Sequence, residues 1–507
     1  MPLEIPRFRT GCQTPQVGPL AGGGRLLATG QAVHPAGEIV TFAGRPVDLA
    51  LSPDGKSLYV KSDRGLVVIS TRAWKIRQEL PFPAGGGSMH GIVVSRDSAR
   101  VYATTAQDRL CEAMVASDGS LAWARQIVLP GPGGSGNSDP CGLALAPDGT
   151  RAYVCLSRNN SLAVVDLKTG VRLKEIPVGV APWGVALSPD GHTAYVTDWG
   201  GRQPRPGERT APSSGTPTLV DARGVAASGA VSIVDLATGR ETASIASGLH
   251  PCDLALTEDG RILAIANANS DTVSVLDTTA RRVVETIRVR PDSALPFGSA
   301  PTGLALGKED RTLYVTDGGN NAIAVVALPP RAAQSPARQP RRSLKGFIPT
   351  GWYPGAVVTD GRVLFVADVK GTGAQIWPAG AKGWNSLQHL GAVERIPIPT
   401  QAALQAYTPQ VLADARIPAI LRARKPTIRV KPPVPVPEHT GDPSVFTHVV
   451  YVIKENRTYD QVLGDIQAGN GDPALCIYGR NVTPNAHALA RRYVLLDNFY
   501  CNGVLSA

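Results

Sequence analysis

The segment PWGVALSPDGHTAYVTD, residues 182–198, decides the fold of this chain. It begins as a short apolar strand after Pro182, turns at Ser-Pro-Asp-Gly, and continues into a second strand that ends at Asp198. An Asp-Gly pair supplies the positive φ angles that a two-residue hairpin turn needs. The segment therefore predicts two antiparallel strands joined by a tight turn.

This segment belongs to a unit that recurs along the chain and adds a further strand of the form Val-x-Val-hydrophobic-Asp. Adjacent units begin 42–53 residues apart where no insertion intervenes, which matches a four-stranded blade of about 40–50 residues. Two units have lost the turn glycine and read Arg96-Asp97-Ser98 and Glu309-Asp310-Arg311. The seven units begin near Pro46, His90, Pro140, Pro182, Pro251, Pro301 and Pro354.

The composition agrees with a repeat protein that is mainly β. The 507 residues include 54 Gly and 43 Pro but only 5% aromatics, which favours many turns between short strands. We therefore predict a seven-bladed β-propeller over residues 25–400, after an N-terminal tail at 1–24. The segment Leu26–Phe42, which includes Glu38–Phe42, is expected to supply one more strand that completes the last blade and closes the ring. An insertion at 200–229, rich in Pro, Gly, Ser and Arg, is expected to be a mobile loop on one rim.

The second strands of the units carry a recurrent motif. Tyr195-Val196-Thr197-Asp198 and Tyr314-Val315-Thr316-Asp317, with Tyr59-Val60 and Tyr153-Val154 in the same register, resemble the YVTN family of β-propeller repeats. The resemblance covers about 330 residues and implies the propeller fold. It does not imply one activity, because propellers host both binding and catalysis.

The net charge of +10 does not indicate a nucleic-acid-binding protein. The excess lies in two Pro-interrupted stretches, residues 331–345 and 416–431, and neither contains an aromatic residue for base stacking. Both are interpreted as linkers or loops, and we expect no nucleic-acid partner. No secretory signal is visible at Met1–Gln13, and no stretch reaches the roughly 18 apolar residues of a membrane span.

A second region follows the repeats. Residues 401–443 are expected to be a linker with a short helix at Gln401–Leu421 and a Pro-rich spacer. A new α/β domain is predicted at 444–507, where Phe446–Ile453 is a continuous apolar strand typical of the middle of a parallel sheet. Polar residues that follow a buried central strand often form the site of an α/β fold, so Glu455 and Asn456 are candidate ligands for a divalent metal.

The order of motifs in this region resembles the start of the phosphoesterase family within the alkaline phosphatase superfamily. The matching runs are Lys454–Asp460, Gly469–Pro473, the Thr483-Pro484-Asn485 helix start, and the predicted strand Tyr493–Tyr500. The resemblance implies a metal-dependent hydrolase of phosphate esters that uses Zn, Mn or Ca. It places Glu455 and Asn456 at the metal and Ser506 as the candidate nucleophile, and it suggests a periplasmic or secreted protein.

Only the beginning of such a domain corresponds to residues 444–507, and the later Asp and His ligands have no counterpart, so we expect a truncated domain that is inactive in this chain. The alternative is a propeller that acts as a binding or scaffold module, with a small molecule or protein on one face, and we expect a monomer. A lactonase-like or quinoprotein-like propeller enzyme is a weaker reading.

Several other side chains have simpler structural interpretations. His448 and His487 are more often structural or exposed than metal-binding. The blade acids Asp198, Asp317 and Asp368 are expected to cap turns, with a binding face as the alternative. Trp183 and Trp352, beside the blade anchors, are expected to pack in the core or rim, with ligand contact as the alternative.

Overall fold

The computed structural model describes residues 17–328, 343–374, 389–424, 432–437, 442–454 and 456–497. The chain divides into two compact units. One comprises Pro19–Leu27 and Gln31–Ile420, and the other comprises Met1–Gly18, Ala28–Gly30 and Leu421–Ala507. Each unit is described by itself.

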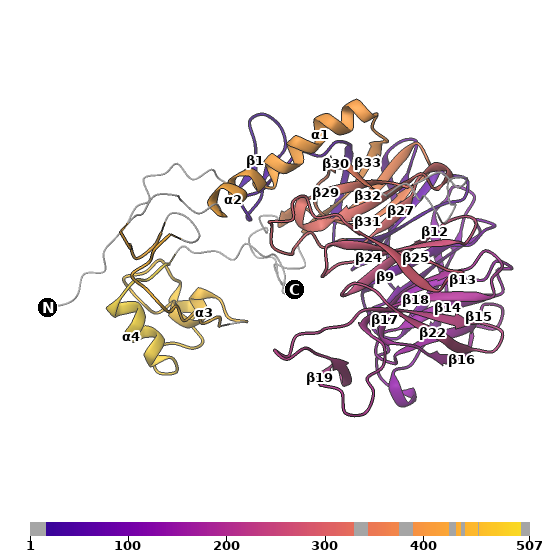
Figure 1. Cartoon of the computed structure of the whole chain (residues 1–507), viewed down its shortest axis with the longest axis horizontal. Coiled ribbons are helices and arrows are strands. Elements are labelled where there is room, and N and C mark those ends of the chain that lie inside the picture. Colours follow the sequence, from indigo (N-terminus) through magenta and orange to yellow (C-terminus); the bar gives the residue numbers. More distant parts are fainter. Residues whose placement is uncertain are drawn as a thin grey trace. The chain divides into compact units, whose positions relative to one another are not determined.

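The larger unit contains seven four-stranded antiparallel sheets, and Figure 1 shows their strands gathered into one body. This arrangement confirms the predicted β-propeller. In spatial order the blades are β5–β8 (Pro46–Leu51, Ser57–Ser62, Gly65–Ser70, Lys75–Pro81), β9–β12 (Gly87–Val94, Arg100–Thr105, Arg109–Val115, Leu121–Val128), β13–β16 (Pro140–Leu145, Arg151–Leu156, Ser161–Asp166, Val171–Pro177), β17–β18–β21–β22 (Val180–Leu187, Thr193–Gly201, Ala230–Asp235, Arg240–Ala246), β23–β26 (Pro251–Leu256, Ile262–Asn267, Thr272–Asp277, Arg282–Arg288), β27–β30 (Leu304–Leu306, Thr312–Asp317, Ala322–Ala327, Ser343–Pro349) and β31–β32–β33–β4 (Trp352–Thr359, Val363–Ala374, His389–Pro397, Glu38–Ala43).

The first strands of the blades form a closed ring. Each contacts the first strand of the next blade, in the order β5, β9, β13, β17, β23, β27, β31 and back to β5. The last blade takes its outer strand from the N-terminal side of the chain, since β4 pairs with β33 from Glu38 with Arg395 to Ala43 with Leu390. The predicted closing strand is therefore confirmed, and it leaves no open position in the seventh sheet.

The threonine of the repeat motif ties neighbouring blades together. The Thr104 hydroxyl donates to Cys141 O at 2.9 Å, and the Thr197 hydroxyl donates to Cys252 O at 2.6 Å. In both cases a second strand reaches the first strand of the next blade. Apolar clusters also span adjacent blades, so each sheet buries its faces against its neighbours.

The insertion at 200–229 contains regular structure that we did not predict. It lies between β18 and β21 of the fourth blade and forms a hairpin of β19 (Thr210–Ser213) and β20 (Thr216–Leu219), which Figure 1 shows outside the stacked sheets. Gln203 Nε2 donates to Val178 O at 3.1 Å, and Asn160 Nδ2 donates to Thr216 Oγ1 at 3.2 Å. Its mobility stays a prediction.

Helix α1 (Gln401–Asp414) belongs to the same unit as the blades. It is capped by the Thr400 side chain and lies beside β30, as Figure 1 shows. Leu404 and Val411 are buried in blade clusters, and the Thr408 hydroxyl accepts from Phe347 N at 3.0 Å. We placed residues 401–443 in a linker, but the compact unit that holds the blades extends to Ile420, within α2 (Ile417–Arg424).

The described part of the C-terminal region forms short helices without a sheet. Helices α3 (Tyr459–Leu463) and α4 (Pro484–Arg492) are present, and α4 has the predicted proline at its start. The predicted strand at Phe446–Ile453 is not formed, and the side chains from Val449 to Ile453 are 73–87% exposed. The described residues 493–497 of the second predicted strand are not a strand either.

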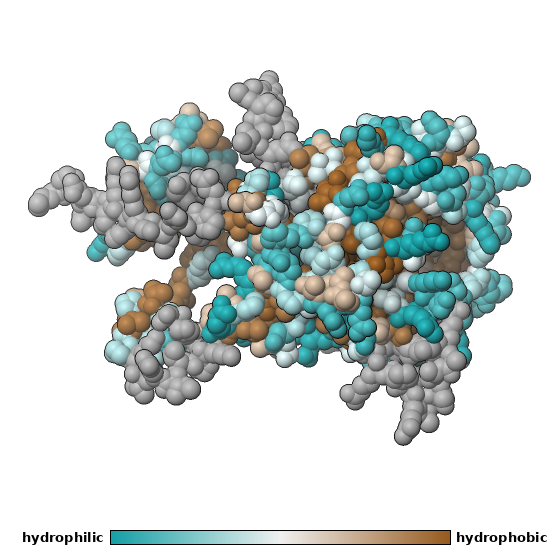
Figure 2. Space-filling model, turned by 90° about the horizontal axis from the view of Figure 1, so that it is seen from above, coloured by the Kyte–Doolittle hydropathy of each residue, from teal (hydrophilic) through white to brown (hydrophobic). Residues whose placement is uncertain are grey.

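The strand predicted at Phe446–Ile453 lacks the neighbour that its backbone groups need, because no described segment pairs with residues 446–454. Residues 498–500 of the other predicted strand lie outside the described residues. The predicted α/β sheet is therefore absent from the described residues. In Figure 2 hydrophobic patches lie among hydrophilic residues on the surface that is visible. None of the described helices has the length and apolar character needed to span a bilayer.

Candidate functional site

The residues predicted to form a metal site are not brought together by the described structure. Glu455 and Ser506 lie outside the described residues. Asn456 is exposed and has a φ of 62°. Within the described ranges, no three His, Cys, Asp or Glu side chains are placed to hold a metal ion. The metal and nucleophile assignments therefore stay predictions.

The two histidines of this region differ in their surroundings. His448 is exposed and contacts the Thr447 hydroxyl at 2.9 Å. His487 on α4 is 1% exposed, and its Nε2 lies 2.6 Å from Asp465 Oδ1. The hydrogen bond from His487 lowers the pKa of Asp465 to about 2. His487 thus has a structural role that links α4 to the turn at residue 465.

A more distinctive group lies on the inner strands of the first two blades. His90 Nδ1 lies 3.0 Å from Asp48 Oδ2, which also accepts from Gly91 N at 2.7 Å. Burial favours the neutral form of His90, but the Asp48 carboxylate outweighs it and raises the pKa of the imidazole. Asp48 and His90 therefore form an ion pair between two blades, which leaves the other ring nitrogen of His90 as a hydrogen-bond donor.

Directly beneath this pair lies a buried lysine. Lys61 on β6 is 0% exposed, and its Nζ donates to Ser88 Oγ at 2.7 Å, Thr104 Oγ1 at 2.8 Å and His90 O at 2.6 Å. Burial lowers the pKa of Lys61 to about 7, although Asp48 opposes the shift. Lys61 occupies the motif position that is threonine in β10 and β18, and it makes the same kind of link to the next blade.

Aromatic rings connect this pair to the fourth and fifth blades. We call the set His90, Trp183, Trp199 and His250 the aromatic ladder. The centroid distances are 6.1 Å from His90 to Trp183, 3.8 Å from Trp183 to Trp199 and 3.8 Å from Trp199 to His250. All four residues are half-buried. The interplanar angle of 5° between His90 and Trp183 makes their rings parallel.

A glycine in the third blade, Gly142, leaves the room that the ladder needs. A Cβ on Gly142 would lie 2.6 Å from Trp183 O and 3.1 Å from His90 Cδ2. Glycine at this position therefore lets His90 of the second blade meet Trp183 of the fourth. At the end of the ladder, burial lowers the pKa of His250 to about 4, so this imidazole is neutral at pH 7.

Left-handed backbone recurs at the start of the inner strands. The residue before the anchor proline has a positive φ in five blades, although such residues are normally extended. Strained conformations of this kind cluster at sites where a surface must be held in one shape. The five residues are Asp139, Ala181, His250, Ala300 and Tyr353, with φ angles from 48° to 65°.

The blade acids do not have the role that we expected. Asp198, Asp317 and Asp368 are each 0% exposed, so they neither cap exposed turns nor line an open face. Burial raises the pKa of all three. Asp198 accepts from the Ser232 hydroxyl at 2.7 Å, whereas Asp368 lies beside the buried carboxyl group of Glu394. The motif aspartate is therefore a buried structural acid.

The two tryptophans that we expected to pack in the core have different surroundings. Trp352 is 5% exposed, as expected of a packing residue, and the Lys370 ammonium lies 5.4 Å from its ring centroid. Trp183 is half-buried and belongs to the aromatic ladder. The alternative that an aromatic contacts a ligand is therefore open for Trp183.

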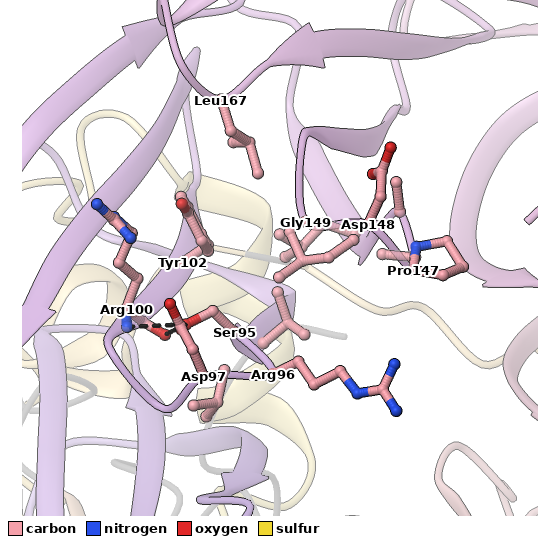
Figure 3. Close-up of a pocket in the computed structure, with 15 residues that line it drawn as sticks. Ser95, Arg96, Asp97, Arg100, Tyr102, Pro147, Asp148, Gly149 and Leu167 are labelled. Carbon is pink, nitrogen blue, oxygen red and sulfur yellow. Dashed lines mark hydrogen bonds between the residues drawn. The ribbon is translucent and has the colours of Figure 1, made fainter.

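A hollow with a volume of about 720 Å³ lies between the turns of the second and third blades, away from the ladder residues. Figure 3 shows Tyr102 and Leu167 at its walls, with Asp148 and Arg96 at opposite turns. Most of its charged groups are engaged locally: Arg100 pairs with Glu112 at 2.9 Å, and Asp148 accepts from Thr150 N at 3.0 Å. Few charged groups of this hollow are therefore free to bind a ligand, and the ladder is the better candidate site.

Sequence reasoning missed His90, Asp48 and Lys61 as a group. The available signal was departure from the repeat. Met89 stands where the other units have an anchor proline, and His90 follows it where the third and fifth units have cysteine. Lys61 stands where the motif has threonine. We found no cluster of His, Glu and Arg at the ends of the inner strands. The group that the structure shows instead uses Asp, His and Trp.

Comparison with known proteins identifies the class of this protein. A family described as YNCE-like beta-propeller matches residues 211–298. The hydrazine synthase of Kuenenia stuttgartiensis is similar in structure, with a TM-score of 0.52, 19% identity, and coverage of 67% of this chain and 97% of that chain. At this identity the likeness shows the fold alone. No curated protein matches the sequence.

The chain is thus a β-propeller protein. The family match lies within the unit that holds the blades, and neither comparison supports the predicted phosphoesterase domain.

Proposed function

We propose that the propeller is a binding module and that the aromatic ladder with the Asp48–His90 pair holds its ligand. The observation that carries the proposal is the continuous contact of four half-buried rings from the second to the fifth blade, which requires glycine at residue 142. Binding sites combine aromatic surface with a few positioned polar groups, and this set has that composition.

The charges of the group favour an uncharged ligand. Asp48 neutralises His90, and Asp253 Oδ2 accepts from Leu304 N at 2.8 Å while burial raises its pKa. Lys61 is enclosed by its own acceptors. What remains is ring surface, the Nε2 donor of His90, and two ring nitrogens, Trp199 Nε1 and His250 Nδ1, which have no hydrogen-bond partner among the described residues. The ligand class is therefore a ring-bearing molecule with a carbonyl or hydroxyl acceptor.

Three probes with the same ring test this proposal. Benzamide, benzoate and benzamidine differ mainly in charge, and their binding is measured by ligand-observed NMR and by quenching of tryptophan fluorescence. We expect benzamide to bind most tightly, and Trp183→Ala and His90→Ala each to weaken it at least tenfold. Trp123→Phe is the matched control, because Trp123 stacks on Phe82 at 5.5 Å, outside the ladder.

Two results contradict the proposal. If all three probes fail to bind the folded chain, the ladder is a packing device. If Trp123→Phe weakens binding as much as Trp183→Ala, the ligand lies elsewhere.

The hydrolase hypothesis rests on the resemblance of residues 454–500 alone. A metal-dependent hydrolase needs several ligands and an activated nucleophile held together. With Glu455, Asn456 and Ser506 as its only candidates, such a site holds a divalent ion weakly.

We therefore expect no turnover of p-nitrophenyl phosphate or bis-p-nitrophenyl phosphate by this chain with Zn²⁺, Mn²⁺ or Ca²⁺. The assay is run beside Glu455→Ala and Ser506→Ala. Metal-dependent turnover that both substitutions abolish would overturn this expectation and establish the hydrolase.

A further inference from the structure

The insertion of the fourth blade forms one wall of a polar pocket. The pocket has a volume of about 810 Å³ and lies between the hairpin β19–β20, the loop before the third blade, and the turn that follows β14. Its lining includes amide, hydroxyl and glycine residues, one arginine and no acidic residue. The residues used below are Ser135, Asn137, Arg158, Asn160, Ser214 and Thr216.

The pocket is built by contacts that fix its walls. Asn160 Nδ2 donates to Thr216 Oγ1 at 3.2 Å, and Asn160 Oδ1 accepts from Ala181 N at 2.9 Å. One side chain therefore joins the hairpin to the start of the fourth blade. On the other wall Gly131 N donates to Gly136 O at 2.8 Å, which closes the loop before the third blade. The hairpin wall is thus tied to the start of the fourth blade, and the loop wall is held by a backbone bond within the loop.

Several polar side chains of the lining take no part in the contacts that fix the walls, and they can bind a ligand. Within the described part of the chain, the side chains of Ser135, Asn137 and Ser214 make no hydrogen bond. The Arg158 guanidinium contacts only Asp139, with Nε 3.8 Å from Oδ2, which exceeds hydrogen-bond distance. Arginine presents its outer edge as a fork that matches an anionic oxygen pair.

We propose that this pocket binds a small hydroxyl-rich anion, an acidic sugar in chemical terms, with its anionic group on Arg158. Hydroxyl and amide side chains both donate and accept, so they suit the hydroxyl groups of such a ligand. No lining carboxylate repels the anion. The anionic group can be a carboxylate or a phosphate, and the experiment distinguishes the two sources.

The test titrates the full chain with four probes: glucuronate, glucose 6-phosphate, glucose and inorganic phosphate. Binding is measured by calorimetry and by ligand-observed NMR. We expect one or both acidic sugars to bind at least tenfold more tightly than glucose and than inorganic phosphate. The stronger of the two acidic sugars identifies carboxylate or phosphate as the preferred group.

Variants locate the site. Arg158→Gln should weaken binding of the acidic sugar at least tenfold, because the substitution removes the only charged group of the lining. Arg151→Gln is the matched control at the other end of β14 and should change affinity less than twofold. Thr216→Ala removes the bond to Asn160 and should weaken binding with Tm unchanged, since Thr216 lies outside the blade sheets.

Several outcomes overturn the proposal. If inorganic phosphate bound as tightly as the acidic sugars, the pocket would recognise only an anion and not the sugar. Binding that survives Arg158→Gln, or that Arg151→Gln also abolishes, would place the ligand elsewhere. Absence of binding by all four probes to a chain with native Tm would also refute it.

Discussion

Replacing Phe42 by alanine is expected to lower the free energy of unfolding by about 3–5 kcal/mol. Phe42 lies on β4, the outer strand of the last blade, and is 3% exposed in a cluster that also contains Trp74 and Phe365. The cluster joins the seventh blade to the first, so a cavity there weakens both the sheet and the closure of the ring. Equilibrium unfolding in urea, followed by circular dichroism, measures the change.

The control is the neighbouring residue on the opposite face of the same strand. Thr41 is exposed, and Thr41→Ala should change the free energy by less than about 0.5 kcal/mol. A chain without residues 1–43 lacks β4 altogether and should lose cooperative unfolding. If Phe42→Ala were as stable as Thr41→Ala, the seventh blade would not depend on β4 for its stability.

Replacing Asp368 by asparagine is expected to stabilise the protein at high pH. Burial raises the pKa of Asp368 from 3.8 to about 7. Burial and the Asp368 carboxylate beside it also raise the pKa of Glu394 well above its usual value. A carboxyl group whose pKa is raised on folding contributes stability below its unfolded pKa and loses it as the pH rises. The native chain should therefore lose stability between about pH 4 and pH 7.

At pH 8.5 the amide removes this loss, so Asp368→Asn should be more stable than the native chain by about 2–4 kcal/mol, and the difference should be small at pH 4.5. Thermal unfolding across this pH range measures it. Asp360→Asn, in the turn of the same blade, is the control, since its side chain only accepts from Arg362 N and Val363 N. A difference that does not grow with pH would show that the buried pair does not titrate.

The blades could be predicted from the sequence because the same turn and strand pattern recurs along the chain. Five of the seven units keep the Asp-Gly turn, and the apolar strand pattern recurs in the other two, so a unit that lacks one signal is identified by comparison with its neighbours. The two units without the turn glycine still fold as hairpins, with Ser98 at a φ of 58° and Glu309 at 58°. The insertion had no such support, so its hairpin was not foreseen.

The aromatic ladder was not predictable from the same evidence. His90 and Trp183 come from blades that are not adjacent, and only the geometry of the ring brings their side chains together across Gly142. In the C-terminal region the apolar run 446–453 was interpreted as a strand from hydrophobicity alone. Hydrophobicity does not supply the hydrogen-bonding neighbour that a strand requires, and α4 was predicted better because a helix satisfies its own backbone.

The closing strand also sets the order of events during synthesis. β4 leaves the ribosome before any blade, but its partner β33 follows it by about 350 residues, since Glu38 pairs with Arg395. At 5–20 residues per second the wait is on the order of 20–70 s. During this time β4 is an unpaired strand with a hydrophobic residue, and it can pair with other nascent chains. The first blade strand to be made is thus the last to be paired, and the yield of folded protein depends on keeping that strand free until β33 has been synthesised.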